Sequence, residues 1–422
     1  MSASPSTSPS PGARREPTSA AKAHRARLRV LIAGGGIAAL EAALALRALA
    51  EERVELELLA PEPQFWYRPL AVVEPFGLGR VHGLELVELA AKVGAQVTLG
   101  ALAAVEPDRH IARTAAGGEI EYDVLVVASG ARPTAAIDGA FTFRGPADSD
   151  AFGKLLAELG AGKVDRLVFA VPGGVTWPLP LYELALMTAT FAEERETAAD
   201  LMLVTPEDAP LAIFGNDASA AVAAMLAQRG VTVRTGTYPL AVDEGQLEVS
   251  PGEAIAADRV VALARIDGAP IAGLPHDRHG FIPTDAHGRV DGVADVYAAG
   301  DVTAFPVKQG GLAAAQADAV AAAIAAGAGA DIAPQPFRPI LRGLLLTGRA
   351  PTYLRAELAG GHGETSVAHS EPLWWPPGKI AGKHLAPFLA DWAGLVLTPV
   401  ETADAVTVEV DLSASADESY DR

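Results

Sequence analysis

The chain has 422 residues, of which 50% are hydrophobic, 20% charged and 6% aromatic, so its apolar mass suffices for two or three packed domains. Its 33 Lys and Arg residues against 52 Asp and Glu residues give a formal net charge of −19, which disfavours a nucleic-acid partner. The absence of cysteine excludes a thiolate nucleophile, an iron–sulfur cluster, a Cys-ligated zinc ion and a dithiol redox pair within the chain.

The N-terminal part of the sequence predicts a leader followed by a nucleotide-binding unit. Residues 1–27 are rich in Ser, Pro and Ala and lack the apolar run of a secretory signal, which predicts disorder. From residue 28 an apolar strand enters a turn that reads Gly34-x-Gly36-x-x-Ala39 and then an Ala/Leu-rich helix. The first glycine permits the tight turn, the second lets backbone approach a pyrophosphate, and Ala39 permits close helix–strand packing. The N–H groups of the helix N-terminus would face the phosphates.

Two further segments are predicted to approach the same nucleotide. The strand over residues 54–59 is followed by Ala60, where an acid usually meets the ribose, and Glu62 comes two residues later. Glu62 either reaches the ribose or is a solvated loop carboxylate. The apolar strand within residues 121–133 closes on Ser129 and Gly130, small residues beside which a nucleotide can pass.

A third segment, residues 296–301, is predicted to be a strand that ends in Gly300 and Asp301. A carboxylate at a strand end suits the hydroxyl groups of an extended polyol cofactor. A long Ala-rich helix is predicted to open around Gly311.

The sequences GGGIAA (residues 34–39), VVASGARP (126–133) and VYAAGDV (296–302), in this order, resemble the FAD-binding segments of the FAD-dependent pyridine nucleotide-disulfide oxidoreductase superfamily. The sequences FWYRPL (residues 65–70), GGLAAAQAD (310–318) and WWPPGKIAGKHLAPFL (374–389) resemble the branch of type II NADH dehydrogenases and sulfide:quinone oxidoreductases. The resemblance implies that the glycine turn meets the FAD pyrophosphate and that Asp301 binds the ribityl chain. It also implies that Arg68 and Pro69 lie near the flavin and that the helix from Gly311 points at the isoalloxazine.

Residues 142–265 predict a second α/β unit, in which the turn after the first parallel strand differs from that of the nicotinamide-binding relatives. Those relatives have a glycine-rich turn, whereas this chain has PGGVTWPLP at residues 172–180. Trp177 and the neighbouring prolines stand where backbone N–H groups would approach a pyrophosphate, and proline has no N–H. Glu207 follows a later strand where a ribose-binding acid belongs. An ordinary NAD(P)H site is therefore in doubt.

Glu183, in the helix after this turn, matches the glutamate that faces the flavin in the resembling families. A carboxylate there could steer a donor or relay a proton. The alternative is an exposed acid near a helix N-terminus, stabilised by the helix dipole. The histidines His276, His279 and His287 lie in a Gly/Pro/Asp loop without helical ligand spacing, so we expect surface histidines and no metal site.

Residues 337–392 combine basic and aromatic side chains in an otherwise acidic protein, with any helix expected only from about Lys379. This composition suits either a peripheral contact with an anionic bilayer or a segment that forms a dimer or covers a domain. By the resemblance, Lys379 and Gln316 match polar groups of a quinone pocket. An ammonium there would stabilise an anion formed on reduction. The alternatives are a surface lysine and a helix-face amide bonded to backbone.

The predicted fold is α/β, with two Rossmann-like three-layer dinucleotide-binding domains plus a C-terminal segment. The predicted parts are a leader (1–27), a split FAD-binding domain (28–141 and 266–336), a second dinucleotide-binding-like domain (142–265), a dimerisation or membrane-facing segment (337–400) and an acidic tail (401–422).

The predicted function is an FAD-dependent oxidoreductase that passes electrons from a small donor to a quinone-like acceptor without a cysteine relay. Two alternatives are an NAD(P)H dehydrogenase with an altered nicotinamide site and a non-catalytic flavin-binding interaction module. The expected location is the cytoplasm or the inner face of the membrane. A homodimer is a further expectation.

Overall fold

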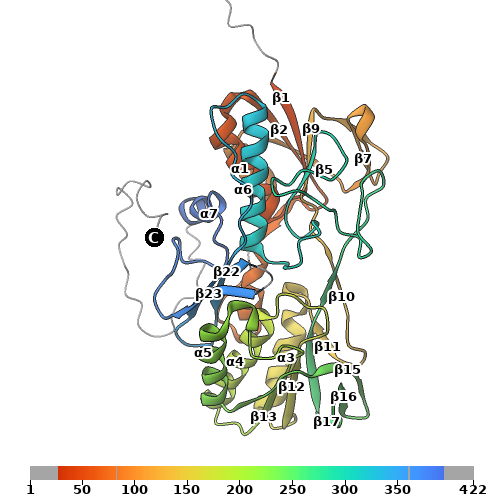
Figure 1. Ribbon diagram of the computed structural model, residues 1–422. Helices are drawn as coiled ribbons and strands as arrows, with labels where there is room; N and C mark the ends of the chain where they lie inside the picture. Colours follow the sequence, from red (N-terminus) through yellow and green to blue (C-terminus); the bar gives the residue numbers. More distant parts are fainter. Residues whose placement is uncertain (1–26, 82, 360–361, 394–422) are drawn as a thin grey trace, which may run out of the picture.

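The computed structural model describes residues 27–81, 83–359 and 362–393. The acidic tail and all but residue 27 of the predicted leader lie outside this part of the chain. Figure 1 shows two α/β units, one above the other, with the strands β22 and β23 and the helix α7 beside their junction.

The first unit has three layers around a parallel five-stranded sheet in the order β20-β9-β1-β2-β5. Alternate side chains of β1 point to opposite faces: Val30 and Ile32 pack under the helices α1 and α6, and Leu31 packs toward a small antiparallel sheet. The elements of this unit are β1 (Leu28–Ala33), α1 (Ile37–Ala50), β2 (Val54–Ala60), β5 (Ala95–Leu99), β6 (Leu102–Glu106), β7 (Ile111–Thr114), β8 (Glu119–Glu121), β9 (Val124–Val127), β20 (Val296–Ala298) and α6 (Gly310–Gly327).

Helix α6 is long and apolar enough to cross a membrane, but most of it is buried inside the fold. It packs along α1, and both helices contribute mainly alanines to their contact. Small side chains let two helices approach closely, so its low polarity is explained by its place in the core of the first unit.

The second unit repeats this design with a parallel sheet in the order β11-β18-β12-β13-β14. A short antiparallel ladder of β10 and β19 lies where the chain leaves the first unit and returns to it. The elements are β10 (Arg132–Thr134), β11 (Phe141–Phe143), α3 (Ser149–Gly160), β12 (Arg166–Ala170), α4 (Leu179–Glu194), β13 (Asp200–Val204), α5 (Asn216–Gln228), β14 (Val231–Arg234), β15 (Tyr238–Asp243), β16 (Gln246–Ser250), β17 (Ile255–Ala256), β18 (Arg259–Leu263) and β19 (Arg265–Asp267).

The C-terminal segment forms a three-stranded antiparallel sheet and one helix. Its strand β21 packs on α4 so closely that a Cβ on Gly343 would lie 2.8 Å from the Leu179 side chain. The helix α7 begins at Leu385, some residues beyond the position near Lys379 before which no helix was expected. Lys379 and Ile380, which precede the helix, bind other elements. The elements are β21 (Ile340–Leu345), β22 (Thr352–Ala359), β23 (His362–His369) and α7 (Leu385–Ala393).

Shorter elements complete the fold. They are η1 (Glu51–Arg53), β3 (Gln64–Trp66), η2 (Arg68–Phe76), β4 (Gly83–Glu85), α2 (Leu86–Lys92), η3 (Pro107–Arg109), η4 (Pro146–Asp148) and η5 (Ala212–Phe214). The two parallel sheets, their covering helices and the added segment confirm the predicted α/β class with two Rossmann-like units.

Candidate functional site

The glycine turn after β1 is shaped for close approach on one side and open on the other. Gly34 has a φ of +152°, and a Cβ there would lie 2.2 Å from the Ala128 carbonyl oxygen, so only glycine fits. Gly36 is exposed, and a Cβ there would meet nothing within 4 Å. Gly36 is also the N-cap of α1 and offers no side-chain cap to the N–H groups of the first turn. Ala39 is fully buried beneath this turn. The turn therefore leaves free N–H groups and open space at a helix N-terminus, as a pyrophosphate requires.

Two other predicted cofactor segments border this turn. Gly130 has a φ of +72°, and a Cβ there would meet nothing within 4 Å, while Ser129 beside it is exposed. Asp301 makes no hydrogen bond or ion pair with any residue that the structure describes. Burial raises the pKa of its carboxyl group, and the nearby Lys308 ammonium opposes that rise. A half-buried carboxylate without a protein partner fits the hydroxyl groups of a ribityl chain.

Gln316 holds the turn that carries Asp301. Its Oε1 accepts a hydrogen bond from the Gly300 N–H at 2.7 Å, and its Nε2 donates to Thr303 Oγ1 at 3.3 Å. Gly300 itself has a φ of +83°, with Ala38 of α1 close by. The amide of Gln316 is thus bonded to the turn backbone, which corresponds to the helix-face alternative and makes Gln316 a support for the cofactor segment.

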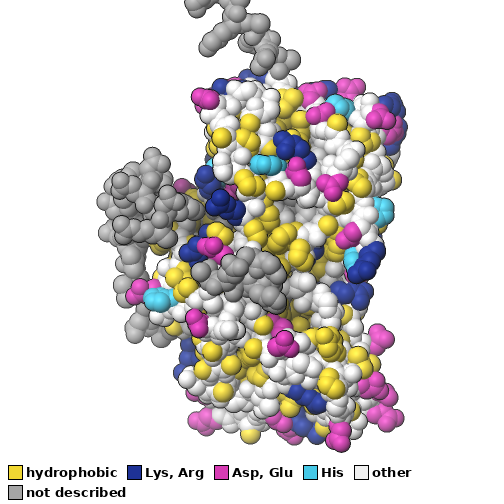
Figure 2. Space-filling model, in the orientation of Figure 1, with side chains coloured by type: hydrophobic (Ala, Val, Ile, Leu, Met, Phe, Trp, Pro, Cys, Tyr) yellow, Lys and Arg dark blue, Asp and Glu magenta, His cyan; other side chains and the backbone are white. Residues whose placement is uncertain are grey.

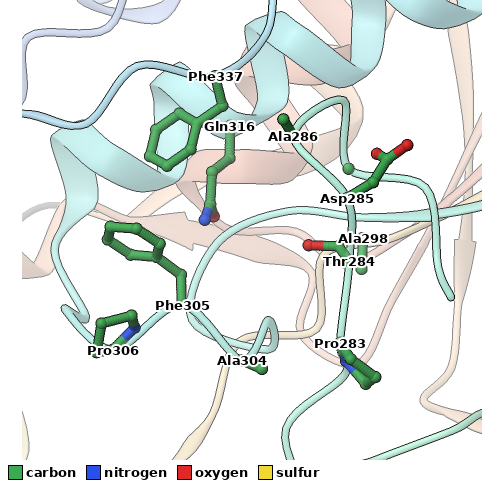
Figure 3. Close-up of a pocket in the computed structure, with 11 residues that line it drawn as sticks. Pro283, Thr284, Asp285, Ala286, Ala298, Ala304, Phe305, Pro306, Gln316 and Phe337 are labelled. Atoms are coloured by element: carbon green, nitrogen blue, oxygen red, sulfur yellow. The ribbon is translucent and has the colours of Figure 1, made fainter. Parts of the chain in front are cut away.

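A cavity of about 330 Å³ lies on the other side of Gln316 (Figure 3). The rings of Phe305 and Phe337 form one wall, with an edge-to-face contact at 5.2 Å between ring centroids. Its lining is mainly apolar and comes from the loop around residues 283–288, the segment 304–306 and α6.

Arg68, Pro69 and Glu62 lie together at the edge of the first unit. Arg68 Nη2 is 3.6 Å from Glu62 Oε2, and both side chains are exposed. Pro69 lies in the first turn of η2. Glu62 thus has an ion-pair partner on an exposed surface, and a contact with the ribose stays a prediction.

The start of α6 meets the C-terminal segment. Gln309 Oε1 caps the helix by accepting the Leu312 N–H at 2.8 Å, and Gly311 is buried there. A Cβ on Gly310 would lie 2.9 Å from the Ile380 side chain. The Ile380 N–H donates to the Tyr67 hydroxyl at 3.1 Å, which ties the segment after residue 378 to the residue before η2. Tyr67 was not singled out from the sequence, although FWYRPL places it next to Arg68.

Glu183 and Lys379, which the sequence analysis placed on the donor and acceptor sides, form one buried ion pair. Lys379 Nζ donates to Glu183 Oε1 and, at 3.1 Å, to the Leu344 carbonyl oxygen. The Leu346 N–H donates to the same Glu183 oxygen at 2.8 Å. Both side chains are buried, so the surface alternatives for both residues are wrong. The reason is tertiary: α4, β21 and the segment after residue 378 converge on this point.

Desolvation dominates the electrostatics of this pair. It raises the pKa of Glu183 and lowers the pKa of Lys379, and in each case the partner's charge opposes the shift. Glu183 Oε2 is buried without a hydrogen-bond partner among the described residues. The pair can therefore hold a proton between Nζ and Oε1 while a second carboxylate oxygen stays free.

The turn after β12 is closed where the first turn is open. Trp177 packs on Phe214 with ring centroids 5.7 Å apart, and Pro178 and Leu179 at the start of α4 are buried. The two glycines of this turn, Gly173 and Gly174, are exposed, but they precede the Trp-Pro-Leu block. The N-terminus of α4 is thus covered by side chains.

Glu207 is not free to meet a ribose. Its Oε2 accepts hydrogen bonds from the Tyr182 hydroxyl at 2.6 Å and from Thr205 Oγ1 at 2.9 Å. Burial raises the pKa of its carboxyl group, and both hydrogen bonds oppose the rise. These contacts join α4 to the end of β13, so the Glu207 carboxylate already has hydrogen-bond partners within the protein.

Lys308 is a charged neighbour of Asp301 that no sequence motif singled out. Its Nζ donates to the carbonyl oxygens of Thr303, at 2.5 Å, and Phe305, at 2.8 Å, and lies 3.7 Å from the centroid of the Phe281 ring. Burial lowers its pKa to about 8. The only feature of the sequence that could have pointed to Lys308 is its place as a single lysine in the apolar stretch before Gln309.

The loop histidines do not converge. The His279 N–H and the His287 N–H bind Asp277 and Asp285, respectively, at separate turns. Within residues 27–81, 83–359 and 362–393, no group of three or more His, Cys, Asp or Glu residues is placed to hold a metal ion.

Comparisons with known proteins agree with this geometry. A family model described as pyridine nucleotide-disulphide oxidoreductase matches residues 28–327. Two NADH dehydrogenase-like proteins of Mycobacterium tuberculosis, from strains H37Rv and CDC 1551, are each 29% identical to the chain over 297 and 299 residues. Each alignment covers 65% of the chain and 73% of the relative.

Solved structures share the fold at low sequence identity. The sulfide:quinone oxidoreductase from Aquifex aeolicus superposes with a TM-score of 0.71 at 18% identity, covering 81% of this chain and 86% of that one. A ferredoxin reductase from Rhodopseudomonas palustris superposes with a TM-score of 0.58 at 18% identity, covering 79% and 83%.

Proposed function

The chain belongs to the pyridine nucleotide-disulphide oxidoreductase family and is an FAD-dependent oxidoreductase, and we propose that it carries electrons from a small donor other than NAD(P)H to a quinone-like acceptor. The observation that carries this proposal is the contrast between the two turns: the turn after β1 is open at a helix N-terminus, and the turn after β12 is closed by Trp177 and Pro178.

The first unit has the residues that would hold FAD. Gly34, Gly36 and the N-terminus of α1 suit the pyrophosphate, and Ser129 and Gly130 border it. The unpaired Asp301 suits the ribityl hydroxyls, and Gln316 keeps its turn in position. When bound, the flavin supplies the two-electron chemistry, while the protein orients it and tunes its electrostatic surroundings.

The second unit does not fit a dinucleotide in the usual pose. Such a pose needs backbone N–H groups at the start of α4, where Pro178 supplies none and Trp177 occupies the approach. It also needs a free acid for the ribose, and Glu207 is bonded to Tyr182 and Thr205. The absence of cysteine removes the dithiol route as well.

The acceptor side of the proposal rests on the Glu183–Lys379 pair. Lys379 is adjacent to Ile380, which packs on the start of α6, the end that by resemblance points at the flavin. A buried ammonium there stabilises negative charge that develops on a reduced ring. Glu183 Oε1 can take the proton that Lys379 Nζ gives up, so the pair can hold or release one proton near the acceptor.

The decisive experiment is anaerobic mixing of the purified yellow protein with candidate donors, followed by addition of a soluble quinone. We expect NADH and NADPH to leave the flavin oxidised, and a small inorganic or organic donor from a screen to bleach it. Reoxidation by the quinone completes the expected cycle. Rapid bleaching by either nicotinamide would contradict the proposed donor class.

An NAD(P)H dehydrogenase is the second candidate. The observation in its favour is the 29% identity to NADH dehydrogenase-like proteins. The same mixing experiment decides between the two, since only this candidate predicts bleaching by a nicotinamide. Family membership favours both enzymes over a non-catalytic flavin-binding module, which would show bound FAD without turnover for any pair of donor and acceptor.

We also propose that the enzyme is cytoplasmic and touches the inner face of the membrane peripherally. Figure 2 shows hydrophobic side chains over the junction of the two units with Lys and Arg side chains beside them. Trp375 is 56% exposed, whereas Trp374 packs on Tyr353 and donates to the Gly378 carbonyl oxygen. The Trp375→Ala variant should float less with anionic vesicles than wild type does. Equal flotation of the two proteins would argue for the alternative, a homodimer contact, which light scattering would detect.

A further inference from the structure

A buried carboxylate of the first unit caps the last helix that the structure describes. Glu41 lies in α1 and is fully buried. Its Oε1 accepts the His384 N–H at 2.7 Å, and its Oε2 accepts the Leu385 N–H at 2.8 Å. Leu385 is the first residue of α7, so Glu41 satisfies N–H groups at a helix start from a distant part of the chain.

The chain before α7 passes directly over this carboxylate. A Cβ on Gly382 would lie 2.5 Å from Glu41 Oε2 and 3.4 Å from the Ala314 side chain. A Cβ at this position would displace the Glu41 carboxylate, so glycine lets the chain pass this close to it.

A second carboxyl group, that of Asp318 in α6, lies against the first. Each of the two carboxyl groups shifts the pKa of the other, and Asp318 Oδ1 is buried without a hydrogen-bond partner among the described residues. His384 Nε2 stands 3.8 Å from that oxygen. Glu41 is fully buried and the Asp318 side chain is partly buried beside it, so the two carboxyl groups cannot both be ionised cheaply, and one of them keeps a proton. Glu41 accepts two backbone N–H groups as an anion would, which leaves the proton on Asp318.

This carboxyl pair anchors one end of a short segment, residues 379–385, which we name the strap. At its other end Lys379 binds Glu183 and the Leu344 carbonyl oxygen, and the Ile380 N–H binds Tyr67. The strap thus links α1 and α6 of the first unit to α4 of the second unit and to β21.

We propose that Glu41 and Asp318 share one proton and act as positioning residues, which hold the strap and with it Lys379 in place, and that loss of this proton releases the strap. The importance of Lys379 rests on the proposed function, but the release of the strap does not. In alkaline solution two negative charges would face each other beneath Gly382, and the His384–Leu385 end would open.

Four titratable groups meet here: Glu41 from α1, Asp318 from α6, and Lys383 and His384 from the strap. Burial, reinforced by Glu41, raises the pKa of Asp318 from its ordinary value of 3.8 to about 9, and Lys383 opposes the rise. Burial lowers the pKa of His384, which keeps that ring neutral at neutral pH. A raised carboxyl pKa stabilises the fold fully below the ordinary value, and this contribution is lost as pH rises through about 9.

Hydrogen exchange of the full-length protein, read from peptides that cover residues 379–391, tests the proposal without reference to the flavin or any donor. In wild type we expect the protection of the strap amides, corrected for the intrinsic exchange rate, to fall about 10-fold or more between roughly pH 7 and pH 10. Asp318→Asn keeps a hydrogen-bond donor toward Glu41 and cannot ionise, so its protection should not depend on pH. Glu41→Gln should lose protection at every pH, because one of its two acceptor oxygens is replaced by a donor.

Asp391→Asn is the matched control, since Asp391 lies exposed in α7 and away from the pair. It should show the wild-type pH dependence. A second measurement, the melting temperature, should rise in Asp318→Asn relative to wild type, with a gap that widens from neutral pH toward pH of about 9. If Asp318→Asn and wild type lose strap protection in parallel as pH rises, the shared proton does not hold the strap. Failure of the donor screen with success here would overturn the proposed function alone.

Discussion

The turn after β1 and the turn after β12 stand at equivalent places in two similar α/β units, and they differ in what covers the helix behind them. The first has Gly36 as the N-cap of α1, with open space around it. The second reaches α4 through Trp177 and Pro178, and the helix start is buried. The same strand–turn–helix geometry thus gives an open anion site in one unit and a packed corner in the other.

This difference shows that two Rossmann-like units of one chain can share an architecture and still differ in how open the turn before the helix is. In the second unit the turn and the helix after it contribute to the core instead: Trp177 of the turn packs on Phe214, and Tyr182 of α4 donates a hydrogen bond to Glu207. The fold places a turn at the sheet edge, and the side chains of that turn decide what binds there.

The largest expected effect comes from filling the open turn. Gly36→Val should fold, because a Cβ there meets nothing within 4 Å, but its side chain would occupy the space beside the helix N-terminus. We expect a colourless protein with a wild-type circular dichroism spectrum. Flavin content per chain, measured from visible absorbance, checks this.

The matched control is Gly173→Val in the second turn. A Cβ at Gly173 would make ordinary contact with the Tyr238 ring at 3.5 Å. This variant should keep its flavin, and equal loss of flavin in both variants would contradict the contrast between the turns.

The next largest effect concerns the buried ion pair between the units. Lys379→Met leaves Glu183 buried without its cation and should lower the free energy of unfolding by about 3–5 kcal/mol. The double variant Lys379→Met with Glu183→Leu should recover part of that loss, because no buried charge remains. Urea unfolding of the single and double variants measures the coupling.

The same variants sharpen the acceptor assignment. Quinone reduction should fall in the double variant even where stability has recovered, since the ammonium is gone. Undiminished quinone turnover in a stable double variant would remove Lys379 from the proposed acceptor site.

A smaller effect is expected at the closed turn. Trp177→Ala removes a half-buried ring from Phe214 and should cost about 2 kcal/mol of stability. It should not create reactivity with NADH, because Pro178 and the bonded Glu207 remain. Trp375→Ala, at an exposed tryptophan, serves as the control and should change stability by no more than about 0.5 kcal/mol.

The smallest effect is expected from Tyr182→Phe, which removes one hydrogen bond to Glu207. The free energy of unfolding should fall by about 1 kcal/mol, and flavin reduction by the donor that the screen identifies should not change. A change in the KM for a nicotinamide would show that Glu207 takes part in dinucleotide binding after all.

Much of the first unit could be predicted because its signals are local. The run from residue 28 to Ala39 contains its own strand, turn and helix, and Gly34 and Gly36 have conformational requirements that can be stated from the sequence. The blocked second turn could also be predicted locally, since Pro178 has no backbone N–H whatever its surroundings.

The contact partners of Glu183, Gln316 and Lys379 could not be predicted from their sequence neighbours. Glu183 and Lys379 are separated by 196 positions, and nothing in either neighbourhood indicates the other. Gln316 shows the same limit on a smaller scale, because its bond to Gly300 depends on how α6 lies along the first sheet.

By itself the sequence determined the class of fold, the open glycine turn after β1 and the lack of any thiol chemistry, since these follow from residue types and short spacings. Only the tertiary structure decided which ionisable groups lie side by side: Glu183 with Lys379, and Glu41 with Asp318. The physical reason is that burial and charge pairing depend on which distant elements pack together. The desolvation free energy of a charged side chain arises only when that packing removes the water around it.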